Sequence, residues 1–199
     1  NYSAASGLKT WDQTKFNNVG WDDLTVHNTS DVLDDVNSYT GKLSLDATSK
    51  NTVSTGLTNN YNITYTDSFA VNKADLTYVA KGTRVYGEAN STSGKDYNFT
   101  FDGLKNGQTI DGDKLTVTNN TSIQANAGSD QTVASASGFN ASGSTGFKES
   151  NYNITTVEAN NKYTITPASL TINIDGSRIY GDSNDTSEYN YSAASGLKT

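Results

Sequence analysis

Residues 74–87 read ADLTYVAKGTRVYG, and residues 168–181 read ASLTINIDGSRIYG. In each stretch an alternating apolar run is followed by a Lys-Gly or Asp-Gly pair and then by Arg, Val or Ile, Tyr and Gly. Alternation with a period of two is typical of a half-buried strand, and such a pair between two runs indicates a hairpin turn. We therefore expect two copies of one β-hairpin, with two-residue turns at Lys81-Gly82 and Asp175-Gly176.

The two ends of the chain also repeat each other. Residues 1–10 and residues 190–199 share the sequence NYSAASGLKT. Ten consecutive identities do not arise by chance, so we expect a parent polypeptide that repeats every 189 residues, of which this chain is a slice. The start at Asn1 likewise predicts an excerpt from a longer polypeptide.

A weaker repeat lies inside this period. LTVHN at 24–28 matches LTVTN at 115–119, and NYNIT occurs at 60–64 and again at 151–155, both at an offset of 91 residues. The hairpin stretches repeat at an offset of 94 residues. These offsets predict two homologous units that alternate along the parent.

Only one of these units is expected to be complete. Unit one occupies residues 75–168, whereas unit two is divided into a later part at 1–74 and an opening hairpin at 169–199. Residues 1–74 would then lack the hairpin that their fold needs, which leaves an unpaired sheet edge and an open core. An isolated hairpin is marginal in water. We therefore expect the two pieces to complete one another, through the continuing repeat array or by head-to-tail contact between copies of the chain.

The composition favours an ordered β-protein with a thin core. Apolar residues make up only 33% of the chain, and Ser, Thr, Asn and Gly rather than charged residues fill the deficit. Tyr, Val, Ile and Thr recur at alternate positions, which is not typical of a disordered chain. We expect an all-β fold of tandem, small β-sandwich-like repeat domains arranged end to end, with a β-grasp-like arrangement as the alternative.

Other segments predict shorter elements. Residues 126–146 have the composition of a linker. The aligned part of unit two, at 31–36 and 41–45, nevertheless has clear apolar spacing, so short strands are expected there. The lone Pro167 is expected between units, where a missing N–H is harmless. Strands are expected at 97–101, within 110–117 after an Asp-Gly turn, at 41–45, at 151–155 and at 163–166, and one helical turn is expected at 32–36.

Charge and residue types exclude several functional classes. The chain has 14 basic and 21 acidic residues and a net charge of −7, without the Lys/Arg stripe of a nucleic-acid-binding protein. The absence of cysteine removes disulfides and thiol chemistry. No apolar run reaches the roughly 18 residues of a membrane span. No nucleophile and base pattern is recognisable, so we expect no enzymatic activity.

The repeated motifs resemble the bacterial adhesin repeat domains known as MBG (YGX type) and YDG. The resemblance rests on RVYGE at 84–88 and RIYGD at 178–182, on Gly-Leu at 103–104 and 196–197, on the NYNIT segments, and on the closing ITPA and VNKA before the next Leu-Thr. It spans essentially the whole chain and departs at 126–146. It implies an all-β extracellular repeat that spaces or presents an adhesive region, with no catalytic residues. Apart from calcium, which the acidic turns leave open, no cofactor is expected.

Within the repeated motif, Arg, Tyr and Gly are the candidate structural residues. Each Tyr is expected to pack between sheets with its hydroxyl group on a backbone partner, each Gly to permit a turn, and each Arg to bridge a carboxylate. The alternatives are a ligand platform at the Tyr-Gly pairs and an anion site at the arginines. The motif residues are Arg84, Tyr86, Gly87, Arg178, Tyr180 and Gly181.

Two acidic turns offer oxygen ligands of the kind that Ca²⁺ binds, although neither matches an EF-hand loop. Their candidate calcium ligands are Asp111, Asp113, Asp182, Asp185 and Glu188. Solvated, turn-forming carboxylates are the expected alternative. His27 is the only histidine and is expected on a strand face. Trp11 and Trp21 are expected to pack at a domain junction, with sugar stacking as the alternative.

Together these features predict a structural tandem-repeat segment, the stalk or filament of a large secreted bacterial adhesin or cell-surface fibre. The expected partners are copies of the chain itself, head to tail, or the continuing array. The competing hypothesis is an adhesive module that binds a glycan or a host-surface ligand through Trp11, Trp21 or the acidic turns. Neither nucleic acid nor a membrane span is expected.

Overall fold

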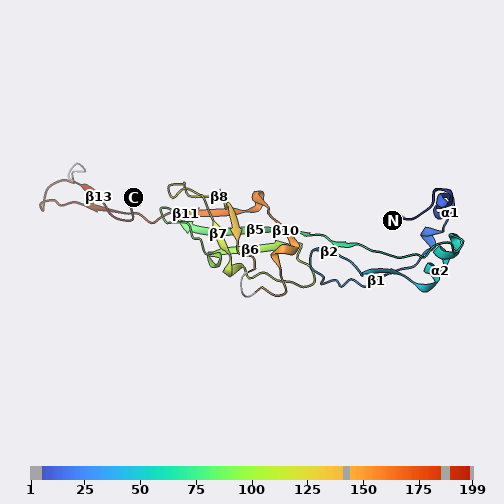
Figure 1. Ribbon diagram of the computed structural model, residues 1–199. Coiled ribbons are helices and arrows are strands. Elements are labelled where there is room, and N and C mark those ends of the chain that lie inside the picture. The colour runs from blue at the N-terminus through green and yellow to red at the C-terminus, as the bar shows by residue number, and fades with distance from the viewer. Residues whose placement is uncertain (1–5, 141–143, 185–188, 198–199) are drawn as a thin grey trace. The chain divides into compact units, whose positions relative to one another are not determined.

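The computed structural model describes residues 6–140, 144–184 and 189–197 (Figure 1). Strands account for 33% of the residues and helices for 18%, so the fold is predominantly β with several small sheets rather than purely β. The chain divides into two compact units, Asn1–Lys73 and Ala74–Thr199, called here the N-terminal and C-terminal units.

The N-terminal unit combines short strands with two helices. Its helix α2 begins after Asp46, whose side chain accepts a hydrogen bond from Ser49 N at 2.6 Å and so caps the helix. The elements are the 3₁₀ turn η1 (Thr10–Asp12), α1 (Gln13–Asn17), η2 (Trp21–Asp23), β1 (Val26–Asn28), β2 (Asn37–Tyr39), β3 (Leu43–Leu45), α2 (Ala47–Gly56) and β4 (Phe69–Val71). Strand β1 pairs with β3, and β2 pairs with β4, both antiparallel.

The C-terminal unit contains the largest sheet. Its elements are β5 (Ala74–Val85), η3 (Gly94–Asp96), β6 (Tyr97–Asp102), η4 (Gly112–Lys114), β7 (Thr116–Thr118), β8 (Gly128–Thr132), β9 (Ser135–Ser137), η5 (Glu149–Asn151), β10 (Tyr152–Thr156), η6 (Glu158–Asn160), β11 (Lys162–Thr166), β12 (Thr171–Asp175) and β13 (Asn190–Ser195). Strand β7 pairs with β9, and β12 pairs with β13.

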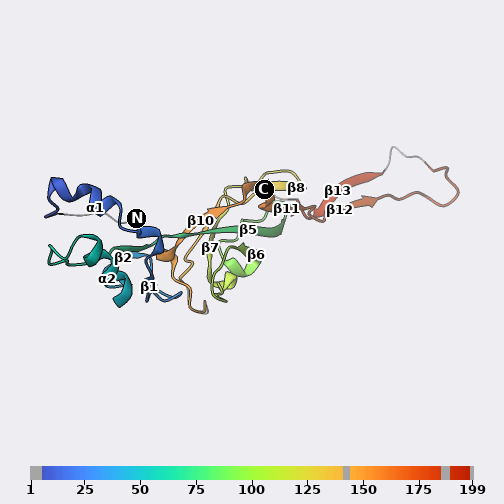
Figure 2. The ribbon, with the colours of Figure 1, turned by 90° about the vertical axis from the view of Figure 1, so that its right-hand side faces the viewer.

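Strand β5 is the centre of a five-stranded sheet (Figures 1 and 2). On one edge β6 runs antiparallel to it, from Thr77 opposite Asp102 to Gly82 opposite Tyr97. On the other edge β10 and β11 follow one another, both parallel to β5. Strand β8 continues the sheet as an antiparallel partner of β11. A single strand of 12 residues therefore holds three others in register.

The hairpin turn predicted at Lys81-Gly82 is wrong, because β5 passes through both residues without a break. A Cβ atom on Gly82 would lie 2.7 Å from the Tyr97 ring and 2.8 Å from the Tyr163 ring. These two rings, 5.7 Å apart between centroids, lie against the glycine from the two flanking strands. The glycine therefore permits close packing of aromatic rings, a role for which it is used inside strands as well as in turns.

The predicted tight turn at Asp175-Gly176 is also wrong. Strand β12 pairs with β13, and Asp175 lies opposite Asn190, so a long connection joins the two strands (Figure 2). Gly176 lies against the ring of Tyr189 as Gly82 lies against Tyr97. Local patterning could not reveal this, because a glycine that admits an aromatic ring and a glycine that makes a turn look alike in sequence.

The core of the sheet consists of two apolar clusters of the C-terminal unit. One contains Leu76, Tyr78 and Tyr152, and the other Ala80, Tyr163 and Ile165, all at most 4% exposed. Leu76, Tyr78 and Ala80 alternate along β5 with half-buried residues. The alternation that the sequence showed therefore places one face of β5 in the core.

Most of the shorter predicted strands are confirmed, namely those at 97–101, 151–155 and 163–166, together with a strand at 43–45 and one following the turn at Asp111. The segment of linker-like composition at 126–146 contains β8 and β9, and residues 141–143 lie outside the described residues. At 32–36 a turn from Asp31 to Asp34 replaces the expected helical turn. Helices α1 and α2 were not predicted.

We expect Gly82→Ala to lower the free energy of unfolding by about 1–3 kcal/mol, since the new methyl group has no room between two rings. Urea unfolding followed by far-UV circular dichroism measures this change. Gly128→Ala in β8 is the matched control, because nothing lies within 4 Å of its Cβ position. Equal effects of the two substitutions would contradict the packing role of Gly82.

Candidate functional site

Strand pairings in the N-terminal unit recur in the C-terminal unit. Strand β1 pairs Val26 with Leu45, and β7 pairs Val117 with Ala136, so each partner is shifted by 91 residues. Strands β2 and β4 pair Asn37 with Val71, and β8 and β11 pair Gly128 with Ile165, at shifts of 91 and 94 residues. The β1–β3 pairing thus has the register of β7–β9, and the β2–β4 pairing agrees with β8–β11 at Ile165, beyond which a register shift toward Tyr163 sets in.

The hairpin of β12 and β13 repeats the pairing of β5 and β6. Asp175 lies opposite Asn190 as Lys81 lies opposite Asn98. Further along, Ile174 lies opposite Tyr191 as Ala80 lies opposite Phe99. The turn after each Arg-Val/Ile-Tyr-Gly motif is also shared, since Glu88 N donates to Val85 O and Asp182 N donates to Ile179 O.

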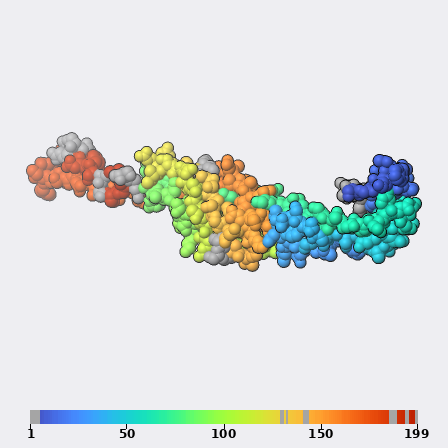
Figure 3. Space-filling view, in the orientation of Figure 1, coloured from blue at the N-terminus to red at the C-terminus, as the bar shows by residue number. Residues whose placement is uncertain are grey.

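The two hairpins differ in what surrounds them. Strand β5 has partners on both edges, whereas β12 pairs only with β13 among the described strands. All five residues of β12 are exposed. The hairpin lies in the red segment of the space-filling view (Figure 3). Leu170 and Ile172 are 50% and 60% exposed, whereas their counterparts Leu76 and Tyr78 are 0% and 4% exposed. Burying a Leu or Ile side chain completely stabilises a fold by about 1.5–3 kcal/mol. The exposed apolar side chains of this hairpin do not make that contribution in the single chain.

The N-terminal unit is uncovered at the matching positions. Its core contains Val19, Leu45, Val53 and Leu57, but Val26 on β1 is 44% exposed whereas its counterpart Val117 is 1% exposed. Phe69 and Val71 are only half-buried, whereas Tyr163 and Ile165 are 1% exposed each. Residues 60–66, the counterpart of β10, form no strand. These apolar side chains and this backbone form a candidate acceptor surface, defined as residues 26, 61–65 and 69–71.

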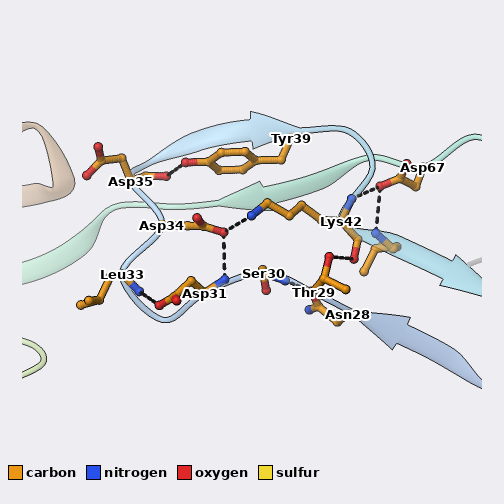
Figure 4. A network of polar contacts seen from close by, with 11 residues as sticks. Asn28, Thr29, Ser30, Asp31, Leu33, Asp34, Asp35, Tyr39, Lys42 and Asp67 are labelled. Carbon is orange, nitrogen blue, oxygen red and sulfur yellow. Dashed lines mark hydrogen bonds and ion pairs between the residues drawn. The ribbon is translucent and has the colours of Figure 1, made fainter.

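A polar network lies beside the acceptor surface (Figure 4). Asp67 accepts hydrogen bonds from the main-chain nitrogens of Gly41, Lys42 and Leu43 at 2.7, 2.9 and 3.0 Å. The bonds from Leu43 and Gly41 contribute most to lowering the pKa of the Asp67 carboxyl group. An ionised Asp67 therefore holds the turn between β2 and β3.

The acidic turn, defined as Asp31–Asp35, belongs to the same network. Lys42 Nζ lies 2.8 Å from Asp34 Oδ2, and this hydrogen bond lowers the pKa of Asp34 and raises that of Lys42. Leu33 N donates to Asp31 Oδ1, and Tyr39 Oη donates to Asp35 O (Figure 4). The sequence analysis did not single out this network. The repeat offered one signal for it: at the 94-residue offset of the hairpin stretches, Asp67 aligns with Asn161, which is buried in the C-terminal unit.

The counterpart of the acidic turn holds a buried arginine in the C-terminal unit. Arg84 is 6% exposed, and its guanidinium group donates to Asn90 Oδ1, Val85 O and Ser122 O at 2.8, 3.2 and 2.7 Å. The carboxylate partner expected for Arg84 is thus replaced by an amide and carbonyl oxygens. The turn that contains Ser122 shares one side-chain hydrogen bond with the acidic turn, since Gln124 N donates to Ser122 Oγ as Leu33 N donates to Asp31 Oδ1.

The rest of the repeated motif differs between the two copies. Tyr86 packs partly buried against the core, whereas Tyr180 is 99% exposed. Gly87 and Gly181 have φ angles of +79° and +96°, which favour glycine, and both follow the tyrosine in a turn. Arg178 is exposed and donates to Ile179 O and Asp182 O. The structure therefore packs the first copy of the motif and leaves the second at the surface.

The calcium candidates do not converge among the described residues, which hold no group of three or more His, Cys, Asp or Glu side chains suited to a metal ion. Asp111 Oδ1 accepts a hydrogen bond from Asp113 N and caps η4. Asp182 lies in the turn after Tyr180. Asp185 and Glu188 lie outside the described residues.

The aromatic candidates have different surroundings. Trp21 packs against Phe16, with ring centroids 4.8 Å apart, and its Nε1 donates to Phe16 O at 2.9 Å. Trp11 is 76% exposed on η1. His27 lies opposite Ser44 on β1. Trp11 is thus the tryptophan with a free ring surface for a ligand.

No family model, curated protein or solved structure matches the chain. The resemblance to MBG and YDG adhesin repeats therefore stays a prediction. In the described part of the chain, no helix has the length and apolar character needed to cross a membrane.

We expect the N-terminal unit to lose stability in acid through Asp67. Because the pKa of Asp67 is lower in the folded chain, its contribution is complete above the ordinary value of 3.8 and is lost as the pH falls through the lowered pKa. Both tryptophans lie in the N-terminal unit, so their fluorescence reports its unfolding selectively.

Asp67→Asn is the variant for this test. An amide has one acceptor oxygen for three main-chain donors, so the variant should be less stable at pH 7 and its urea midpoint should depend less on pH between 2 and 7 than that of the native chain. Asp22→Asn, at an exposed carboxylate, is the control. An unchanged pH profile in Asp67→Asn would contradict the role of this carboxylate.

Proposed function

We propose that this chain is a structural tandem-repeat segment, a stalk or filament piece of a large secreted bacterial adhesin or extracellular fibre. In this proposal the repeats are small β-sandwich-like domains arranged end to end. Unit one is complete at 75–168, and unit two is divided between 1–74 and 169–199. The segment spaces or presents an adhesive region at the bacterial cell surface and catalyses no reaction.

The recurrence of strand pairings at offsets of 91 to 94 residues carries this proposal. Registers that agree at β1–β3 and β7–β9, and again at β12–β13 and β5–β6, support one ancestral unit used twice. In repeat proteins, stability is the sum of intrinsic unit terms and nearest-neighbour interfaces, which suits a long extended array. The resemblance of the sequence motifs to MBG and YDG repeats supports the extracellular setting.

A ligand-binding adhesive module is the second candidate, and the exposed ring of Trp11 favours it. Sugars stack on exposed aromatic faces of this kind. The surface cavities of the C-terminal unit are less suited to a glycan. One of about 630 Å³ beside β5 and β6 is lined by both cationic and anionic side chains, among them Lys81, Lys95, Asp96 and Glu88.

A chain of two consecutive 189-residue periods tests the architectural proposal. Its maximum dimension in small-angle X-ray scattering should grow in proportion to the number of periods, because each unit contacts only its neighbours. A single-period chain at the same concentration is the reference. A compact two-period particle, whose dimension grows only with the cube root of its mass, would count against a stalk.

A glycan array probed with the 199-residue chain separates the two candidates. A structural segment should show no saturable binding. Saturable binding that is lost in Trp11→Ala and kept in Thr14→Ala, a substitution at a nearby exposed position, would instead support the adhesive module. Trp21→Ala serves poorly here, because this ring packs against Phe16.

A further inference from the structure

We propose that the hairpin of β12 and β13 completes the N-terminal unit of a second copy of this chain by strand complementation. The hairpin inserts beside residues 61–65 and 69–71 as β5 lies beside β10 and β11. This inference rests on the proposed function, because it assumes that the two units share one fold. It adds the donor, the acceptor and the register of the contact between copies.

The C-terminal unit supplies the template for the register. There Tyr152–Thr156 pairs in parallel with Ala74–Tyr78, and Tyr163–Thr166 pairs in parallel with Gly82–Val85. Shifting these pairs by the sequence offsets places Tyr61 opposite Ala168 and Ile63 opposite Leu170 of the other copy. It also places Phe69 opposite Gly176 of the other copy. Residues 60–66, which form no strand in the single chain, become the counterpart of β10.

The apolar surfaces of donor and acceptor match. The core cluster around Leu76 and Tyr78 includes Tyr152, Leu115 and Ile154, whose counterparts Tyr61, Leu24 and Ile63 pack at the edge of the N-terminal core. That core lacks the counterparts of Leu76 and Tyr78, which are Leu170 and Ile172 on the exposed hairpin. The hairpin thus exposes the two apolar side chains whose counterparts are missing from the N-terminal core.

The polar contacts match as well. Arg178 corresponds to the buried Arg84, and Asp31 corresponds to Ser122, whose carbonyl oxygen accepts a hydrogen bond from Arg84. In the complex Arg178 therefore reaches the acidic turn, where Asp31, Asp34 and Asp35 replace the uncharged side chains of the template. The cation meets an anionic surface, which favours this pairing.

Parallel pairing also indicates that the partner is a second copy. It puts the donor strand's entry beside Tyr61 and its far end beside Val71. The acceptor chain leaves at this far end, because β4 ends at Val71 and β5 begins at Ala74. Donor and acceptor chains thus enter and leave at opposite ends of the completed unit. Such a contact is heterologous and extends head to tail into a fibre unless the rotation between copies closes a ring.

Disulfide trapping between two variants of the full chain tests the register, since the chain has no cysteine of its own. The template pair Asn153 and Asp75 is exposed and joined by a hydrogen bond of 3.2 Å, so its counterparts Asn62 and Ser169 tolerate substitution. Mixing Asn62→Cys with Ser169→Cys under oxidation should give a crosslinked heterodimer, because neighbouring strands place Cα atoms about 5 Å apart.

Asn62→Cys mixed with Asn173→Cys is the matched control. Asn173 lies on the same strand face as Ser169 but four residues further, about 13 Å along the strand, beyond the reach of a disulfide. Circular dichroism of the reduced variants establishes that each remains folded. Equal crosslinking in both mixtures, or none in either while the chain stays monomeric up to its solubility limit, would overturn the proposal.

Arg178→Glu tests the polar contact independently. Placing an anion against the acidic turn should raise the dissociation constant for self-association about tenfold or more in analytical ultracentrifugation at low salt. Lys81→Glu makes the same charge change on the exposed face of β5 and should leave association unaltered. Equal weakening by both variants would mean that net charge alone is responsible.

The failure of this inference is distinguishable from that of the proposed function. An elongated two-period chain with no register-specific crosslink would leave the repeat array standing and remove the contact between copies. Register-specific crosslinking by a chain that also binds a glycan saturably through Trp11 would keep the contact and assign the chain to the adhesive class.

Discussion

The pairing of β5 on both of its edges is the interaction on which the rest of the described sheet depends. Antiparallel β6 and parallel β10 and β11 satisfy its main-chain groups. The same alignment brings Leu76 and Ala80 to complete burial and lets the rings of Tyr97 and Tyr163 meet over Gly82. Hydrogen bonding and apolar burial are therefore coupled, because losing one edge of β5 would expose both the backbone and the core.

Strand β12 has the same alternating sequence as β5, but among the described strands it has a partner on one edge only. Natural proteins usually protect an exposed edge with Lys, Pro, a bulge or a covering loop. Thr171–Asp175 has neither Lys nor Pro, and its only irregularity lies between Thr171 and Ile172. With Leu170 and Ile174 exposed, β12 thus has an apolar edge without these usual protections. In the N-terminal unit Val26 is likewise exposed, and Phe69 and Val71 are half-buried.

Elements that depend on local sequence patterns were predictable, whereas features that depend on contacts between residues far apart in sequence were not. Strands β6, β10 and β11 were foreseen, because two-residue alternation is local and survives in the fold. The role of Gly82 was not, because the rings that require it come from residues 15 and 81 positions away in sequence. Helix α2 was missed since its sequence, ATSKNTVSTG, has weak helix propensity and depends on the Asp46 cap and the burial of Val53. The sequence singled out Arg84 within the repeated motif, but it did not predict the burial of its guanidinium group against an amide and carbonyl oxygens.

The sequence by itself determined the repeated stretches and their offsets, because identity and spacing are properties of the sequence alone, and from them it predicted the division of one unit between the two parts of the chain. It also determined which strand face is apolar. Only the tertiary structure decided that β5 is one continuous strand, that β10 and β11 share its second edge, and that β12 pairs with β13 alone among the described strands. Strand pairing joins residues far apart in sequence, and its register depends on which surfaces bury one another, a fact that no local pattern contains.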